Sequence, residues 1–125
     1  MVRDVRKDEA ASYFNKAENF YAASLDEFEK SRFDVAVFNA SQSIILANDS
    51  LCIAALGRRP SKDHREAIQL HIQAAAGRES KRDIISEALT KRGEFGYTEK
   101  NASKEEAHML LVRTKRFLDW VKERI

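Results

Sequence analysis

The stretch from residue 33 to residue 56 constrains the fold more than any other part of the chain. It reads FDVAVFNASQSIILANDSLCIAAL and holds no Lys, Arg or Glu, although 34% of the sequence is charged. Its only charged residues are Asp34 and Asp49. Small residues recur along it at alternating steps of four and three, at Ala36, Ala40, Ser43, Ala47, Ser50 and Ala54. This spacing marks one face of an α-helix, and apolar residues on the other faces indicate burial on most sides. We therefore predict a central helix, roughly 36 Å long, against which other helices pack closely.

The segments on either side of this stretch also show helical periodicity. Apolar residues at steps of three and four predict long helices over about 8–30 and 103–124. Two shorter patterns predict a pair of short helices over about 63–76 and 80–92. Together with 33–56, these segments predict an all-α, up-and-down helical bundle of four to five helices, three of them long. The pattern leaves open whether the two short helices are separate or continuous.

Local signals place the ends of these helices. Glycine is favoured just after a helix, and glycines follow three of the predicted helices, at Gly57, Gly77 and Gly93. Asp63 with Glu66 and Ser103 with Glu106 have the spacing of a capping box, which marks a helix start. Residues 93–102 are therefore predicted to form the one sizeable loop.

Length and composition indicate the class of protein. A chain of 125 residues predicts a single domain over 1–125, large enough to bury a core. The only cysteine, Cys52, lies in the predicted central helix and is expected to be a small core residue, which excludes a disulfide within the chain. The N-terminus has no apolar run like that of a signal peptide, and no stretch of about 20 apolar residues occurs. We expect a cytoplasmic protein with no membrane association.

The charge distribution suggests one candidate binding site. The net charge of +2 implies no partner, but residues 57–92 hold nine basic and five acidic side chains. Five side chains that can carry positive charge gather between the central helix and the next one, at Arg58, Arg59, Lys62, His64 and Arg65. Such a cluster at a helix N-terminus is typical of a phosphate- or nucleotide-binding site. The alternative is a solvated loop at the end of the bundle.

Two pairs of residues are candidates for catalysis. An Arg and a His together can stabilise a scissile phosphate and move a proton, as RNA cleavage requires, and Arg65 with His71 is such a pair. However, the two lie about 120° apart on an ideal helix, and the apolar face that holds His71 favours a core histidine. The second pair is Arg92 with Tyr97. Tyr97 is either a stacking group in a cleft or a residue that packs the loop onto the bundle.

No metal or cofactor site is predicted. The three histidines, His64, His71 and His108, do not have the spacing of metal ligands. Phosphate-binding glycine-rich loops, nucleophile elbows and metalloprotease motifs do not occur in the sequence.

The order of segments in the chain resembles that of a known family. The segments are Lys16-Ala17-Glu18 in the first helix, SRFDVAV at 31–37 before the small-residue helix, GRRPSKDH at 57–64 after it, Lys91-Arg92 with Tyr97, and SKEEA at 103–107 opening the last helix. Over about residues 10–123 this order resembles HEPN domains (higher eukaryotes and prokaryotes nucleotide-binding). The resemblance implies a helical bundle that forms a homodimer. It also implies a nucleotidyltransferase-type partner protein, as in toxin–antitoxin modules.

The resemblance also bears on catalysis. Active HEPN domains are metal-independent RNases with an Arg followed by a His after four to six intervening residues, near the loop before the last helix. In this sequence Arg92 matches the Arg, but Tyr97 stands near the position of the His. A phenol with a pKa near ~10 is a poor general base at neutral pH, so this departure argues against RNase activity.

We therefore expect a HEPN-like nucleotide- or RNA-binding module that is non-catalytic and acts with a nucleotidyltransferase-type partner in a toxin–antitoxin-like system. One alternative is a metal-independent HEPN RNase toxin that uses Arg92 or Arg65 with His71 or Tyr97. Another is a structural helical adaptor.

Overall fold

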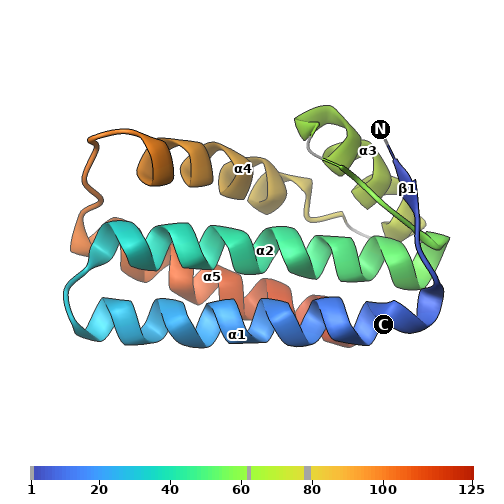
Figure 1. The fold of residues 1–125 in the computed structure, drawn as a ribbon, viewed down its shortest axis with the longest axis horizontal. Helices are drawn as coiled ribbons and strands as arrows, with labels where there is room; N and C mark the ends of the chain where they lie inside the picture. Colours follow the sequence, from blue (N-terminus) through green and yellow to red (C-terminus); the bar gives the residue numbers. More distant parts are fainter. Residues whose placement is uncertain (1, 62, 78–79) are drawn as a thin grey trace.

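The computed structural model describes residues 2–61, 63–77 and 80–125 (Figure 1). Within these ranges the elements in chain order are β1 (Arg3–Asp4), the 3₁₀ turn η1 (Lys7–Glu9), α1 (Ala10–Glu29), α2 (Phe33–Leu56), β2 (Arg58–Arg59), α3 (His64–Ala75), α4 (Arg82–Tyr97) and α5 (Lys104–Lys122). The chain is an all-α helical bundle, as predicted, and α2 has the predicted bounds.

Helix α2 is the centre of the bundle. It lies between α1 and α4, with α5 packed on a third side and α3 near its C-terminal end (Figure 1). The small residues of its stripe bring α1 close, since the hydroxyls of Ser43 and Ser50 donate hydrogen bonds of 2.7 Å to the backbone carbonyls of Ala17 and Ala10. These bonds satisfy two polar groups that are fully buried. The small side chains thus allow the close helix contact that the sequence predicts.

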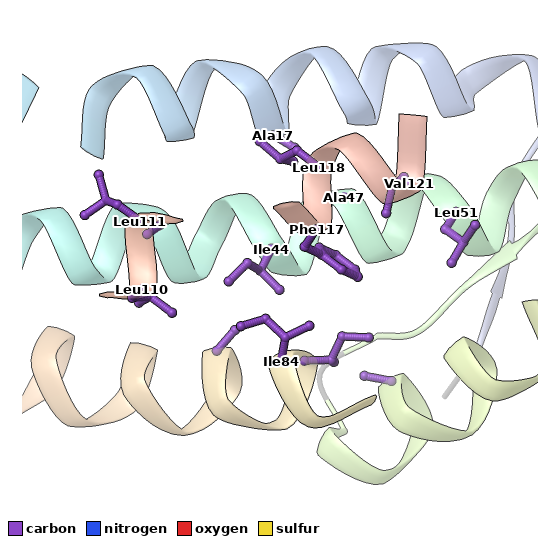
Figure 2. Packing of buried hydrophobic residues seen from close by; sticks show 14 of the residues in the cluster. Ala17, Ile44, Ala47, Leu51, Ile84, Leu110, Leu111, Phe117, Leu118 and Val121 are labelled. Atoms are coloured by element: carbon purple, nitrogen blue, oxygen red, sulfur yellow. The ribbon is translucent and has the colours of Figure 1, made fainter. Parts of the chain in front are cut away.

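The hydrophobic core forms where α4 and α5 meet α2. Figure 2 shows Ile44 and Leu51 of α2, Ile84 of α4, and Phe117 and Val121 of α5 pointing toward one another. All five side chains are buried. Because side chains from three helices interlock here, the position of α5 relative to α4 is fixed largely through α2.

The predicted helix ends are largely confirmed. Gly57 follows α2 with a positive φ of 67°, a conformation that glycine adopts without strain. The Asp63 carboxylate caps α3 by accepting a hydrogen bond from the Arg65 amide, and Ser103 and Glu106 form the predicted capping box of α5. α3 ends at Ala75, so the two short helices are separate.

The end of α4 differs from the prediction. We predicted that this helix ends at residue 92 and that a loop follows over 93–102, but α4 continues through Gly93 to Tyr97. The extra turn buries the Phe95 side chain in the core cluster. Burial of an aromatic ring contributes about 2–3 kcal/mol, which offsets the cost of about 1 kcal/mol for each of the two glycines, Gly93 and Gly96, that the longer helix includes. The loop is therefore only about six residues long.

A two-stranded sheet was also not predicted. β1 pairs with β2 in antiparallel register, with Arg3 opposite Arg59 and Asp4 opposite Arg58. The pairing ties the N-terminal segment to the end of α2. Two-residue strands have no sequence periodicity, which explains why the pattern did not reveal them. In the described part of the chain, no helix is long and apolar enough to span a membrane.

Candidate functional site

The structure divides the predicted phosphate-binding cluster into two parts. Arg58 and Arg59 form β2, where Arg58 meets the exposed Gln73 of α3 and Arg59 meets the buried Asp49 of α2. The Arg58 Nη2 atom lies 3.4 Å from the Gln73 Oε1 atom, and the Arg59 Nη1 atom lies 3.9 Å from the Asp49 Oδ2 atom. The Arg59 guanidinium also lies 5.5 Å from the centroid of the Tyr13 ring. These two arginines are half-buried and already have partners within the chain.

The other part of the cluster is exposed. His64 and Arg65 lie in the first turn of α3, and both are exposed to solvent. The His64 Nε2 atom is 3.2 Å from the Ser86 hydroxyl. Lys62 lies outside the described residues. The side chains most accessible to a ligand among the described residues of this connection are therefore His64 and Arg65.

His71 is a core histidine, as the alternative interpretation of the sequence proposed. Its ring is fully buried, and its Nε2 atom accepts a hydrogen bond of 2.8 Å from the Lys81 amide. Because Nε2 accepts, the proton is on Nδ1, which donates to the Asn48 side-chain oxygen at 3.0 Å. Burial lowers the pKa of His71 from 6.5 to about 4, so the ring is neutral at pH 7. Arg65 is exposed and His71 is buried, so these two residues are not brought together.

Arg92 belongs to a cluster of polar side chains between α2 and α4. Its Nη1 atom donates a hydrogen bond of 3.2 Å to the Gln42 side-chain oxygen. Arg92 and Asp49 also line a small cavity of about 40 Å³, together with Asn48 and Pro60. Asp49 is only 6% exposed, and burial raises its pKa to about 7, while the charges of Arg59 and Arg92 act in the opposite direction. Arg92 is thus held by side chains of α2.

Asp49 was not among the predicted site residues. The sequence did contain a signal, because Asp49 is one of only two charges in the central helix and the only one far from its ends. A charge in such a position needs a partner when it is buried. The sequence could not show that Arg59 and Arg92 are those partners.

Tyr97 does not lie beside Arg92. It is 77% exposed at the C-terminal end of α4, and its ring meets the Phe38 ring edge-on with 6.2 Å between centroids. Five residues along a helix amount to about 140° of rotation, which turns the two side chains to different faces of α4. The ring contacts Phe38 of α2 and is otherwise largely exposed to solvent.

The profile of the HEPN domain family matches residues 10–124. The chain belongs to the HEPN family. HEPN domains are nucleotide- or RNA-binding modules and are often of the RNase type. A comparison with curated proteins found no match. In the described part of this HEPN domain, no three His, Cys, Asp or Glu side chains gather in the manner of a metal site.

A further group of charged side chains was not singled out by the sequence analysis of this HEPN domain. Lys81 at the start of α4 and Arg113, Arg116 and Trp120 of α5 line an open cleft of about 390 Å³. The signal that could have found the α5 residues is their spacing, because steps of three and four place them on one face of a helix. Lys81 comes from a segment more than 30 residues earlier, and only the fold brings it to the cleft.

Proposed function

We propose that this HEPN domain is a non-catalytic nucleotide- or RNA-binding module that acts with a nucleotidyltransferase-type partner in a toxin–antitoxin-like system. The observation that carries the proposal is the setting of Arg92. The Arg that matches the family motif is bound to Gln42 and faces Asp49, while Tyr97 points elsewhere. Among the described residues no histidine contacts this Arg, and the carboxyl group that it faces, Asp49, is buried, which supports binding of phosphate rather than its cleavage.

The histidines of the chain support the same view. Metal-independent RNA cleavage needs a base that removes the proton of the attacking hydroxyl. His71 is buried in the core, His64 lies beside Ser86, and the His108 ring is 6.1 Å from the Phe28 ring. None of these contacts involves Arg92 in the part of the chain that the structure describes. Among the described residues, the Arg of the family motif therefore has no histidine in contact with it.

Binding of a nucleotide or RNA is supported by the exposed side chains at the start of α3. His64 and Arg65 project from the first turn of α3, where backbone amides and the helix dipole favour an anion. Asp63 already uses the Arg65 amide as a cap, so the side chains rather than that amide would meet a phosphate. RNA held in this way is bound mainly through its backbone and without strong sequence preference.

Cleavage and binding can be tested in parallel. Purified protein and the Arg92→Ala variant are incubated with total RNA in EDTA, and we expect the RNA to remain intact with both. Cleavage that Arg92→Ala abolishes would show a working RNase and overturn the non-catalytic assignment. In a gel-shift titration, we expect affinity for single-stranded RNA to fall steeply with salt. Arg65→Ala should weaken binding, while Lys16→Ala, at an exposed position of α1, should not.

The proposal includes two protein partners. A homodimer is proposed from the exposed apolar side chains at one end of α2 and α4, where Val35 and Tyr97 are 44% and 77% exposed. The nucleotidyltransferase-type partner is proposed from family membership alone. It is tested by co-expression with a nucleotidyltransferase encoded beside this gene, followed by gel filtration. Separate elution of the two proteins would count against this part of the proposal.

A further inference from the structure

The cleft between α4 and α5 has the size and the lining of a small-ligand site. Its volume of about 390 Å³ lies within the range of small-molecule pockets. It is lined by Lys81, Asp83, Arg113, Arg116, Phe117 and Trp120. Three positive side chains thus face one negative side chain and two aromatic rings.

The positive charges of the cleft are only partly used within the chain. Arg113 forms an ion pair with Glu87 of α4. Among the described residues, Arg116 has no ion-pair partner, and the Lys81 ammonium lies 6.0 Å from the centroid of the Trp120 ring. Two of the three cations are therefore available to an anion that enters the cleft. Arginine and lysine together favour a phosphate, which arginine can bind in a bidentate manner.

The remaining walls fit the other parts of a nucleotide. Trp120 forms the apolar wall of the cleft, and the buried Phe117 ring lies behind it, nearly parallel, with 5.9 Å between ring centroids. Such a wall is suited to the flat face of a base. The Asp83 carboxylate can accept hydrogen bonds only, which suits the hydroxyls of a ribose but not a phosphate.

The cleft is held in shape by buried groups. The His71 ring accepts a hydrogen bond from the Lys81 amide and so fixes the start of α4. The same ring lies 5.7 Å from the Trp120 ring and 6.3 Å from the Phe117 ring. The Arg124 guanidinium also lies 4.1 Å from the centroid of the indole and donates to the Trp120 carbonyl. One buried histidine thus positions both the lysine and the aromatic wall, so little ordering is required when a ligand binds.

We propose that this cleft binds a ribonucleotide, with its phosphate between Lys81 and Arg116, its ribose at Asp83 and its base against the Trp120 ring. The inference rests on the proposed nucleotide-binding function and assigns it to a second site, formed by α4 and α5. The phosphate can belong to a free nucleotide or to a single-stranded RNA, because both offer the same groups to the cleft.

The cleft contains its own reporter, since Trp120 is the only tryptophan of the chain. AMP is titrated while tryptophan fluorescence is followed, with N-acetyltryptophanamide as a control for absorption by the nucleotide. We expect saturable quenching, and Arg116→Ala should weaken AMP binding about tenfold, the loss expected for one charge-assisted contact. The control is Lys104→Ala, at an exposed position about 18 Å away along α5, which should leave the affinity unchanged. Adenosine and inorganic phosphate should each bind more weakly than AMP.

The outcomes separate this inference from the proposed function. If single-stranded RNA binds in the gel-shift titration but neither AMP nor a short oligoadenylate changes Trp120 fluorescence, the cleft assignment is wrong and the function stands. Equal affinity of AMP for the Arg116→Ala variant and the unmodified protein also overturns the assignment. If no nucleotide or RNA binds in either assay, both proposals fail. When quenching occurs, tighter and more salt-sensitive binding of oligoadenylate than of AMP identifies RNA as the ligand, and similar affinities identify the free nucleotide.

Discussion

Two buried titratable residues, His71 and Asp49, respond to burial in opposite ways. Both prefer their neutral forms because the interior disfavours charge. For His71 this means a pKa of about 4, below its usual value, and for Asp49 a pKa of about 7, above its usual value. His71 is held neutral by two hydrogen bonds, whereas Asp49 has two arginines nearby. Folding stability should therefore depend on pH through both residues, with opposite signs.

The first prediction concerns His71. Between pH 6.5 and about 4, the unfolded chain binds a proton at this residue that the folded chain does not bind, so acidification destabilises the fold. The full effect is on the order of 3 kcal/mol. His71→Gln removes the titration, so the stability advantage of the unmodified protein over this variant should be largest at pH 7 and should shrink toward pH 4. Urea unfolding followed by circular dichroism at a series of pH values measures this difference.

Asp49→Asn provides a control, because the pH dependence of stability due to Asp49 has the opposite sign to that due to His71. The folded chain keeps a proton on Asp49 up to about pH 7, whereas the unfolded chain loses it near pH 4, so ionisation of Asp49 costs stability as the pH rises. Relative to the unmodified protein, Asp49→Asn should therefore gain stability as the pH rises from about 4 to about 7. A difference between His71→Gln and the unmodified protein that stays constant with pH would contradict the buried, neutral state of His71.

At the level of elements, α4 continues past a residue that favours a helix end, because a residue beyond it packs in the core. Gly93 predicted a helix end, yet α4 passes through it because Phe95, one half-turn later, enters the core. The two glycines of α4 then have different roles. A Cβ atom on Gly93 would meet no atom within 4 Å, whereas a Cβ atom on Gly96 would lie 2.5 Å from two carbons of the Phe38 ring. Gly96 is therefore required by the close approach of Phe38, and Gly93 is not.

The second prediction compares these glycines. Gly93→Ala should raise the free energy of unfolding by about 0.5–1 kcal/mol, because alanine is favoured inside a helix and has space here. In Gly96→Ala, alanine has the same advantage in helix propensity, but its Cβ atom must displace the Phe38 ring from its packing with Tyr97. The Gly96→Ala protein should therefore be less stable than the Gly93→Ala protein. Denaturant unfolding of both variants tests the comparison. A destabilising Gly93→Ala would mean that α4 ends at residue 92 after all.

At the level of the whole molecule, the features that the sequence predicted correctly are those that depend only on residues close together in the chain. Helix bounds and caps follow from periodicity and from signals within a few residues, and Ser103 with Glu106 is an example. The features that the sequence did not predict depend on contacts between segments far apart in the chain. Arg92 meets Gln42, 50 residues earlier, and Lys81 meets the aromatic wall of α5 only after folding. The charge cluster at Arg58 and Arg59 is partly used within the chain for the same reason, because Gln73 and Asp49 lie within reach of the two guanidinium groups.

The third prediction is that the whole molecule is a homodimer. α1, α4 and α5 cover most of α2, but its first turns are left with Val35 exposed next to the Phe38–Tyr97 contact. An apolar patch at the end of a central helix is typical of an interface, and a second copy would bury it. Light scattering coupled to gel filtration should therefore give twice the mass of the 14.3 kDa chain.

Substitution at the patch tests whether this surface is the interface. Val35→Glu places a negative charge in the first turn of α2, where the helix dipole favours it, so the fold should persist while the dimer dissociates. The matched control is Val112→Glu on α5, at a valine of similar exposure, which should remain dimeric. Circular dichroism checks that both variants stay helical. A dimer that survives Val35→Glu but dissociates with Val112→Glu would place the interface on α5, whose residues Arg113, Arg116 and Trp120 also line the proposed nucleotide cleft.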